Sequence, residues 1–320
     1  MSDQRTWQPD VLEGFEQTTL KMPDADDGRV EITLVRRATS LTGGQAVLYV
    51  HGFGDYFFQR HLADFFEQQG LRFYAIDLRR HGRSMRPHQW PDYTSDITEY
   101  VADMDAAVEV LMAEEGVTWL AVNGHSTGGL ATVIHAARGE RRSAVDALFL
   151  SSPFLDMNLP QVQEVLLEPV IAFLGGFMPQ LKIGSLHSLY GDSIHISQKG
   201  EWDFDLDWKP LTGFPARAGW VRAMHRAQGE VERGLQLPQP VLLLHSSRSL
   251  RPKVWEDDIQ RADIVLDVAD MRRLGPGLGT NVEVTEVPDA MHDLVLSRLD
   301  VRAHTFELVA EWLGRVKPAA

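Results

Sequence analysis

Six short apolar runs alternate with segments of helical periodicity, and this alternation constrains the fold more than any other feature of the chain. The runs are mostly apolar and β-branched, which is typical of strands buried on both faces of a parallel sheet. Consecutive parallel strands need a crossover, usually a helix, so the pattern predicts an α/β fold. The predicted strands lie at 45–53, 72–79, 118–124, 145–152, 240–247 and 282–289, and the clearest helices at 59–70, 98–116, 130–140 and 302–316.

The two ends of this pattern complete the expected architecture. Residues 15–23 and 29–38 alternate apolar and polar side chains across a turn rich in Asp and Gly, which predicts an antiparallel edge pair. We therefore expect a mostly parallel eight-stranded sheet with antiparallel N-terminal strands and helices on both faces. From 153 to 237 the strand pattern stops, and aromatics, prolines and helical pieces predict a helical cap inserted after the sixth strand. The expected core is then divided into 1–152 and 238–320.

Composition excludes several classes of function. The formal net charge of −14 argues against binding a nucleic-acid backbone, and the absence of cysteine excludes thiolate chemistry and Cys-based zinc sites. The polar N-terminal stretch lacks the pattern of a signal peptide, so we expect a cytoplasmic protein. The most apolar segment, 165–178, is too short and too interrupted to span a membrane, and we expect an amphipathic element over a pocket without stable membrane insertion. The sequence leaves a homodimer open.

The sequence Gly-His-Ser-Thr-Gly at 124–128 lies between a predicted strand and a predicted helix. A sharp turn at this place holds the Ser126 side chain up at the end of the sheet, and the flanking glycines relieve steric clash. The motif alone is weak evidence, and a plain turn in which Ser126 caps the helix is the alternative. Its context favours a nucleophile.

Several motifs in one order resemble the α/β-hydrolase superfamily over nearly the whole chain. They are HGFGDY at 51–56, DLRRHGRS at 77–84, GHSTGG at 124–129, the cap, and MHDL at 291–294. The resemblance is greatest to the monoglyceride lipase and lysophospholipase-like branch, and the chain also looks like bacterial monoalkyl phthalate hydrolases in size and motif order. It implies an oxyanion hole made by the backbone N–H groups of Phe53 and Thr127. The base is expected at His292, the only histidine on a loop after the last predicted strand.

The acid is where this sequence departs from the family pattern. Members usually carry it a few residues after the seventh strand, where HSSRS at 245–249 places Ser249. A hydroxyl cannot hold an imidazolium by charge, so a carboxylate must come from elsewhere. Asp263 resembles the family's acid best, because an amphipathic segment follows it and its distance of 29 residues from His292 suits the family, with 248–261 then an insertion. The other candidates are Asp258, Asp156, Asp257 and Asp267, of which Asp258 and then Asp156 come next.

These features predict a serine carboxylic-ester hydrolase with a Ser126–His292–Asp263 triad, no cofactor and no metal. The aromatic cap suits a small-molecule ester with an apolar group, and the expected substrate-binding residues are Phe154, Trp202, Trp208 and Trp220. Two substrate classes stay open, monoacylglycerol-like esters and monoalkyl phthalates. A ligand receptor or scaffold of the same fold, with slow or no turnover, is the alternative from a different class.

Overall fold

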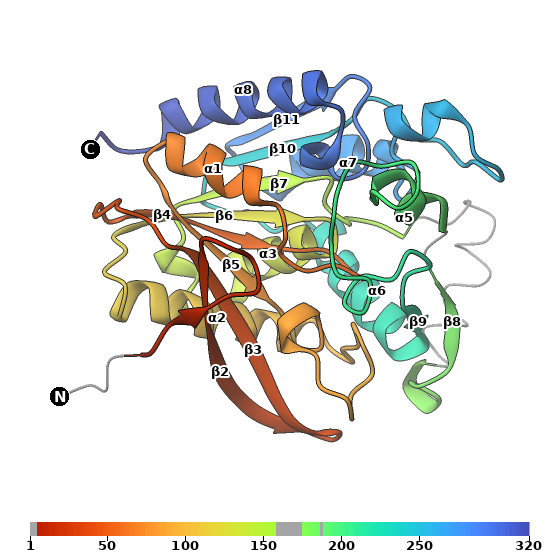
Figure 1. Ribbon diagram of the computed structural model, residues 1–320, viewed down its shortest axis with the longest axis horizontal. Helices are drawn as coiled ribbons and strands as arrows, with labels where there is room; N and C mark the ends of the chain where they lie inside the picture. Colours follow the sequence, from red (N-terminus) through yellow and green to blue (C-terminus); the bar gives the residue numbers. More distant parts are fainter. Residues whose placement is uncertain (1–4, 158–174, 186–187, 320) are drawn as a thin grey trace.

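The fold is built around one large, mostly parallel sheet, seen in a computed structural model that describes residues 5–157, 175–185 and 188–319 (Figure 1). The sheet order is β1-β2-β3-β5-β4-β6-β7-β10-β11, with β1 to β3 and the β3–β5 pair antiparallel and the remaining pairs parallel. The strands are β1 (Gln8–Pro9), β2 (Phe15–Ala25), β3 (Gly28–Arg37), β4 (Gln45–Val50), β5 (Arg72–Asp77), β6 (Trp119–His125), β7 (Ala147–Ser151), β10 (Val241–Ser246) and β11 (Val282–Val287).

Helices cover both faces of this sheet, as the apolar character of the strands predicted. One face packs against α1 and α8, and the other against α2, α3, α6 and α7. Every residue of β6 is buried, as expected of a strand at the centre of a sheet that is covered on both sides. The helices are α1 (Arg60–Gln68), α2 (Thr98–Ala113), α3 (Thr127–Arg138), α5 (Ser188–Ile194), α6 (Ala218–Glu232), α7 (Val268–Leu274) and α8 (Leu299–Val316).

The loops between these elements contain short 3-10 helices, η1 (Gly82–Ser84), η2 (Arg142–Ala144), η3 (Asp257–Arg261), η4 (Gly275–Leu278) and η5 (Leu294–Leu296). The expected architecture is confirmed, with one difference in the described part of the chain. The sheet has nine strands rather than eight, because Gln8 and Pro9 pair with β2 and add a short edge strand. Two residues are too few to show the alternation by which a strand is predicted.

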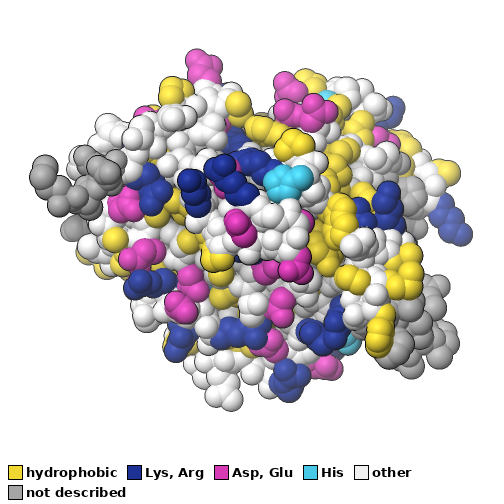
Figure 2. All heavy atoms as spheres, turned by 90° about the horizontal axis from the view of Figure 1, so that it is seen from below, with side chains coloured by type: hydrophobic (Ala, Val, Ile, Leu, Met, Phe, Trp, Pro, Cys, Tyr) yellow, Lys and Arg dark blue, Asp and Glu magenta, His cyan; other side chains and the backbone are white. Residues whose placement is uncertain are grey.

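The segment between β7 and β10 carries the elements that stand beside the carboxyl ends of the parallel strands (Figure 1). It contains α5, α6 and a two-stranded antiparallel sheet of β8 (Lys182–Ser185) and β9 (Pro215–Arg217). The division of the chain at 152 and 237 stays a prediction, and residues 165–174 of the expected amphipathic element lie outside the described residues. Hydrophobic side chains gather on the surface at this end of the molecule, as Figure 2 shows. Exposed examples in the segment are Phe177, Met178, Leu181 and Ile183.

Candidate active site

Ser126 is the single residue between the end of β6 and the start of α3. Its backbone has φ 52° and ψ −120°, a conformation that L-residues rarely adopt and that costs on the order of 1–3 kcal/mol. The turn is held because the Ser126 N–H donates to the Ser151 carbonyl at 3.0 Å, and the Ser126 carbonyl accepts from Phe154 at 2.9 Å. The strain places the hydroxyl at the carboxyl end of the sheet instead of inside the helix.

The glycines of the motif are required by close backbone approach. A Cβ on Gly128 would lie 2.3 Å from the His51 carbonyl oxygen and 2.4 Å from that of Val50, so the first turn of α3 packs directly on the end of β4. A Cβ on Gly124 would lie 2.5 Å from Thr132 Oγ1. The sharp turn thus depends on the absence of side chains at both positions.

His292 lies on the loop that follows β11 and reaches back to Ser126. Its Nε2 is 3.0 Å from Ser126 Oγ, and its Nδ1 is 2.8 Å from Asp263 Oδ2. The imidazole is 3% exposed. This arrangement forms one chain of hydrogen-bonding groups from the hydroxyl to the carboxylate, which is the geometry that general-base activation of a serine requires.

Asp263 is fully buried and held from several sides. Its Oδ1 accepts from the N–H groups of Val265 and Leu266, each at 2.8 Å, which leaves Oδ2 directed at His292. A parallel bridge joins Asp263 to Ser249. The chain therefore loops out between these two residues and returns the carboxylate beside the position where the family pattern expects it.

The alternative acids have other partners. Asp258 is exposed on η3, and its carboxylate pairs with Arg248 at 3.0 Å. The Asp156 carboxylate forms an ion pair with Arg273. The structure brings Asp263, and neither of these two, against His292.

The two expected oxyanion donors flank Ser126. Thr127 is the first residue of α3, so its N–H has no acceptor within the helix and lies at the positive end of the helix dipole. Phe53 lies on the loop after β4, and no acceptor of its N–H is found among the described residues. Both residues line the same cavity as Ser126.

This cavity has a volume of about 320 Å³, and Ser126 and His292 both line it. Its walls are mostly apolar, and among the expected substrate-binding residues Phe154 and Trp220 line it, with their rings stacked 6.0 Å apart. The segment from β7 to β10 also contributes Met157, Ile183, Tyr190 and Val221 to the walls.

Trp202 and Trp208 are not among the described residues that line this cavity, and their part in substrate binding stays a prediction. Trp202 stacks on His61 at 4.4 Å and donates its indole N–H to the Leu296 carbonyl, while Trp208 packs edge-on against Tyr56. Both rings pack the segment between β7 and β10, here called the cap segment, against the core. Aromatic composition cannot distinguish these two roles, because the direction of each ring is set by tertiary partners.

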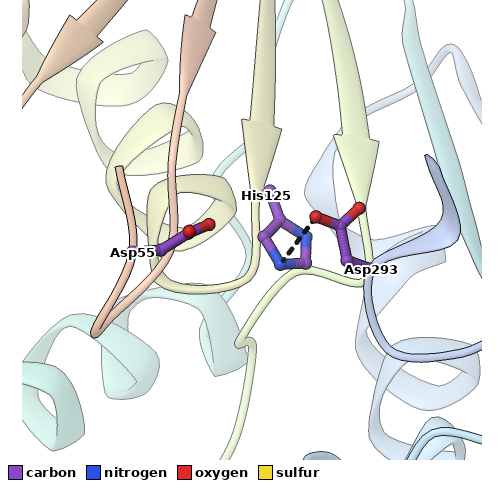
Figure 3. Close-up of side chains that lie close together, drawn as sticks. All are labelled: Asp55, His125 and Asp293. Carbon is purple, nitrogen blue, oxygen red and sulfur yellow. Dashed lines mark ion pairs between the residues drawn. The ribbon is translucent and has the colours of Figure 1, made fainter. Parts of the chain in front are cut away.

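A polar cluster that was not predicted from the sequence lies beside Ser126. Asp55, His125 and Asp293 offer ligand atoms that all lie within 4.8 Å of one another, and Figure 3 shows the imidazole between the two carboxylates. Burial lowers the pKa of His125, and its Nε2 lies 3.9 Å from Asp293 Oδ2. Burial alone would raise the pKa of Asp55, but the Lys209 ammonium holds it below its ordinary value.

Such ligands suit a divalent cation, but Lys209 already supplies a positive charge at this place. Its Nζ lies 2.6 Å from Asp55 Oδ1, and both residues line the cavity. We therefore assign the cluster as an ion-paired network and propose no metal. The clue in the sequence was Asp55 itself, two residues after the expected oxyanion donor Phe53.

Residues 44–250 match the family described as serine aminopeptidase, S33, and the match spans well over half of the chain. The chain belongs to this family. The match ends one residue after Ser249, so the family identifies the region of Ser126 while Asp263 and His292 lie beyond it. The expected class, a serine hydrolase, is confirmed for this S33-family protein.

Solved structures similar to this S33-family protein share its fold at low sequence identity. A soluble variant of monoglyceride lipase from Saccharomyces cerevisiae, in complex with a substrate analog, has a TM-score of 0.72 at 18% identity, covering 98% of this chain and 99% of that one. Monoacylglycerol lipase from Paleococcus ferrophilus has a TM-score of 0.63 at 19% identity, and the match covers 94% of this chain and 100% of that one. A thermophilic esterase from Thermogutta terrifontis has a TM-score of 0.59 at 18% identity, and the match again covers 94% of this chain and 100% of that one.

These likenesses confirm the α/β-hydrolase fold of the S33-family protein. Within the described residues, no helix combines the length and the apolar character needed to cross a membrane. The expected cytoplasmic location stays a prediction.

Replacement of Gly128 by Ala is expected to destabilise the protein. The added Cβ meets two carbonyl oxygens at the end of β4, and overpacking of this kind costs roughly 1–3 kcal/mol of unfolding free energy. Urea unfolding followed by circular dichroism measures the change. Gly314→Ala is the matched control, because Gly314 lies in α8 with nothing within 4 Å of an added Cβ. Equal stability of the two variants would contradict the role of Gly128.

Ser126 is expected to react covalently with a fluorophosphonate probe, because His292 can accept its proton as the oxygen attacks phosphorus. Intact-mass and peptide mass spectrometry measure the site and rate of labelling. Ser126→Ala should abolish it, while Ser197→Ala, at an exposed serine of the cap segment, should leave it unchanged. Labelling that persists in Ser126→Ala would exclude Ser126 as the nucleophile.

Proposed function

We propose that the protein is a serine carboxylic-ester hydrolase that acts on neutral, apolar monoesters of small to medium size. The observation that carries this proposal is the hydrogen-bonded chain from Ser126 through His292 to Asp263, set at an apolar cavity. The names of the structural neighbours, monoglyceride lipases and an esterase, support the same reaction class. A cavity of about 320 Å³ is at the small end of ligand sites, which suits small to medium esters.

The reaction begins with proton transfer from Ser126 Oγ to His292 Nε2 as the oxygen attacks the ester carbonyl. Asp263 holds the imidazole in the tautomer that presents Nε2 and stabilises the imidazolium that forms. The negative oxygen of the tetrahedral intermediate accepts from the Phe53 and Thr127 N–H groups. His292 protonates the leaving alkoxide as the carbon–oxygen bond breaks. Water then attacks the acyl-enzyme by the same steps, which releases the acid and restores Ser126.

The charges around the cavity favour esters over peptides with a free N-terminus. Recognition of an N-terminal ammonium needs an available carboxylate near the scissile bond. Among the described residues lining the cavity, Asp55 is the sole carboxylate, and Lys209 already pairs with it at 2.6 Å. The carboxylate of Asp263 is turned to His292 and is fully buried. The family description therefore sets the catalytic class, and the cavity favours a neutral substrate.

The same charges favour neutral esters over monoalkyl phthalates. Lys209 is the only lysine or arginine among the described residues that line the cavity, and Asp55 already neutralises it. A substrate carboxylate would enter an apolar site without a free cation, and burying an unpaired charge is costly. Monoacylglycerol-like esters carry no such charge.

A receptor or scaffold with slow turnover is the alternative. The geometry favours turnover, because Ser126 and His292 are within hydrogen-bonding distance at 3.0 Å without any rearrangement. A burst of p-nitrophenol from short p-nitrophenyl esters, lost in Ser126→Ala, supports the hydrolase. Absence of turnover across all acyl lengths would overturn the proposal in favour of the receptor.

Asp263→Asn is expected to lower kcat for p-nitrophenyl butyrate by about 10³–10⁴-fold, because an amide neither fixes the imidazole tautomer nor stabilises the imidazolium. Asp258→Asn is the matched control and should stay within about twofold of wild type, since the Asp258 carboxylate is exposed and pairs with Arg248. Initial rates at saturating ester measure both variants. The reverse outcome would move the acid to Asp258.

A matched pair of substrates tests the charge argument. Butyl benzoate and monobutyl phthalate share an aromatic acyl group and a butyl leaving group, and they differ by one carboxylate. We expect kcat/KM for monobutyl phthalate to be lower than that for butyl benzoate by a factor of about 10² or more, because its carboxylate lacks a free cation in the cavity. A pH-stat assay at constant ionic strength measures both, with 1-monobutyrin as the monoacylglycerol reference. Preference for monobutyl phthalate would contradict the proposed substrate class.

A further inference from the structure

A buried lysine of the cap segment reaches the loop that carries the expected oxyanion donor. Lys209 is 7% exposed, and its Nζ lies 2.6 Å from Asp55 Oδ1, 154 residues away in the sequence. Lysine is almost never buried without a partner, so the pair fixes the position of both side chains. It joins the segment between α5 and β9 to the loop after β4.

The loop at 51–55 is short and is held on two sides. On the core side, the Gly54 backbone lies beside the buried carboxylate of Asp92. On the cap side, Asp55 accepts from Lys209. Phe53 lies between these anchors, and Gly54 has φ 62°, a left-handed conformation that allows the chain to turn directly after it.

A second cap contact supports the same loop. The Phe53 ring packs against the Trp220 ring of α6, with centroids 4.5 Å apart. The cap segment thus holds the side chain of Phe53 through Trp220 and the following backbone through Lys209 and Asp55. The cap segment therefore contacts both Phe53 itself and the residue two positions after it.

The surroundings of the Lys209 ammonium make this anchor stiff. Three aromatic rings lie 5.6–6.0 Å from Nζ, those of Phe58, Tyr190 and Phe204. An ion pair screened from water by aromatic rings is stronger than one at the surface, and removal of one partner is correspondingly disruptive. Other titratable groups near the pair include Asp92, His51, His125 and Asp293.

We propose that Lys209 is a positioning residue for the reaction, which holds the Phe53 N–H in place through Asp55 so that the oxyanion hole is complete only when the cap segment is seated. The inference rests on the proposed ester hydrolysis and on Phe53 as an oxyanion donor. It assigns the cap a part in transition-state stabilisation in addition to its part in lining the substrate cavity. Misplacement of a donor by about 1 Å is enough to lower a rate on the order of 10²-fold.

Lys209→Met removes the ammonium and keeps most of the apolar stem. We expect kcat for p-nitrophenyl butyrate to fall about 10- to 100-fold with KM changed less than about threefold, since the donor acts on the transition state. Lys199→Met is the matched control, because Lys199 is an exposed lysine of the same segment, and it should keep wild-type kcat. Lys209→Arg should recover part of the loss.

A change of leaving group separates positioning from substrate contact. An incomplete oxyanion hole slows p-nitrophenyl butyrate and methyl butyrate by the same factor, because both form the same tetrahedral oxygen. A lysine that contacts the leaving group affects the two esters differently and raises KM. Unequal factors, or a loss confined to KM, would overturn the proposal.

The double variant Asp55→Asn/Lys209→Met separates positioning from a purely structural role. It removes both partners of the Lys209–Asp55 ion pair, so its thermal midpoint should return toward that of wild type even if Lys209→Met alone folds poorly. Under the proposal, kcat of the double variant stays at least about 10-fold below that of wild type, because the Lys209–Asp55 ion pair is missing. Recovery of kcat together with stability would overturn the inference. Lack of esterase activity in wild type would count against the proposed function instead.

Discussion

The strained turn at Ser126 is the constraint on which the rest of the site depends. A positive φ at a non-glycine residue persists only where the surrounding structure enforces it, and here β7, the Pro153–Phe154 backbone and the end of β4 all contact the turn. Because parallel strands end at the same edge of the sheet, the loops after β4, β10 and β11 converge on that turn. The loop of Phe53, Asp263 and His292 approach Ser126 from these three places.

Much of this arrangement was predictable from the sequence. Strands buried on both faces leave an unbroken apolar run, and the crossover helices leave a helical period, so the order of elements followed from local patterns. Ser126 could be located because it directly follows a recognisable strand, and His292 because it lies on the loop after the last strand. The two-residue strand β1 and the directions of Trp202 and Trp208 could not, since no local pattern encodes them and tertiary partners decide them.

The proposed acid, Asp263, could not be identified from local sequence patterns alone. After β10 the chain leaves the family spacing, and several carboxylates remain compatible with the sequence between Arg248 and the next helix. What selects Asp263 is a long-range contact, the bridge to Ser249, together with two backbone N–H groups that hold one carboxylate oxygen. An insertion can therefore displace the acid along the sequence while a backbone bridge returns it to the same place in space. Spacing identifies such an acid only when the loop length is fixed.

The charges around the cavity link substrate choice to catalysis. Asp55, Asp263 and Asp293 place three carboxylates near Ser126, and Lys209 is the one lysine or arginine among the described residues that line the cavity. Since that cation comes from the cap segment, core and cap share the electrostatic balance of the site. A cap substitution that displaced Lys209 would leave the Asp55 carboxylate unpaired. The loop of Phe53 would lose its contact with the cap segment, and the cavity would repel anions more strongly. The proposed preference for neutral esters and the proposed placement of the oxyanion donor then depend on the same ion pair.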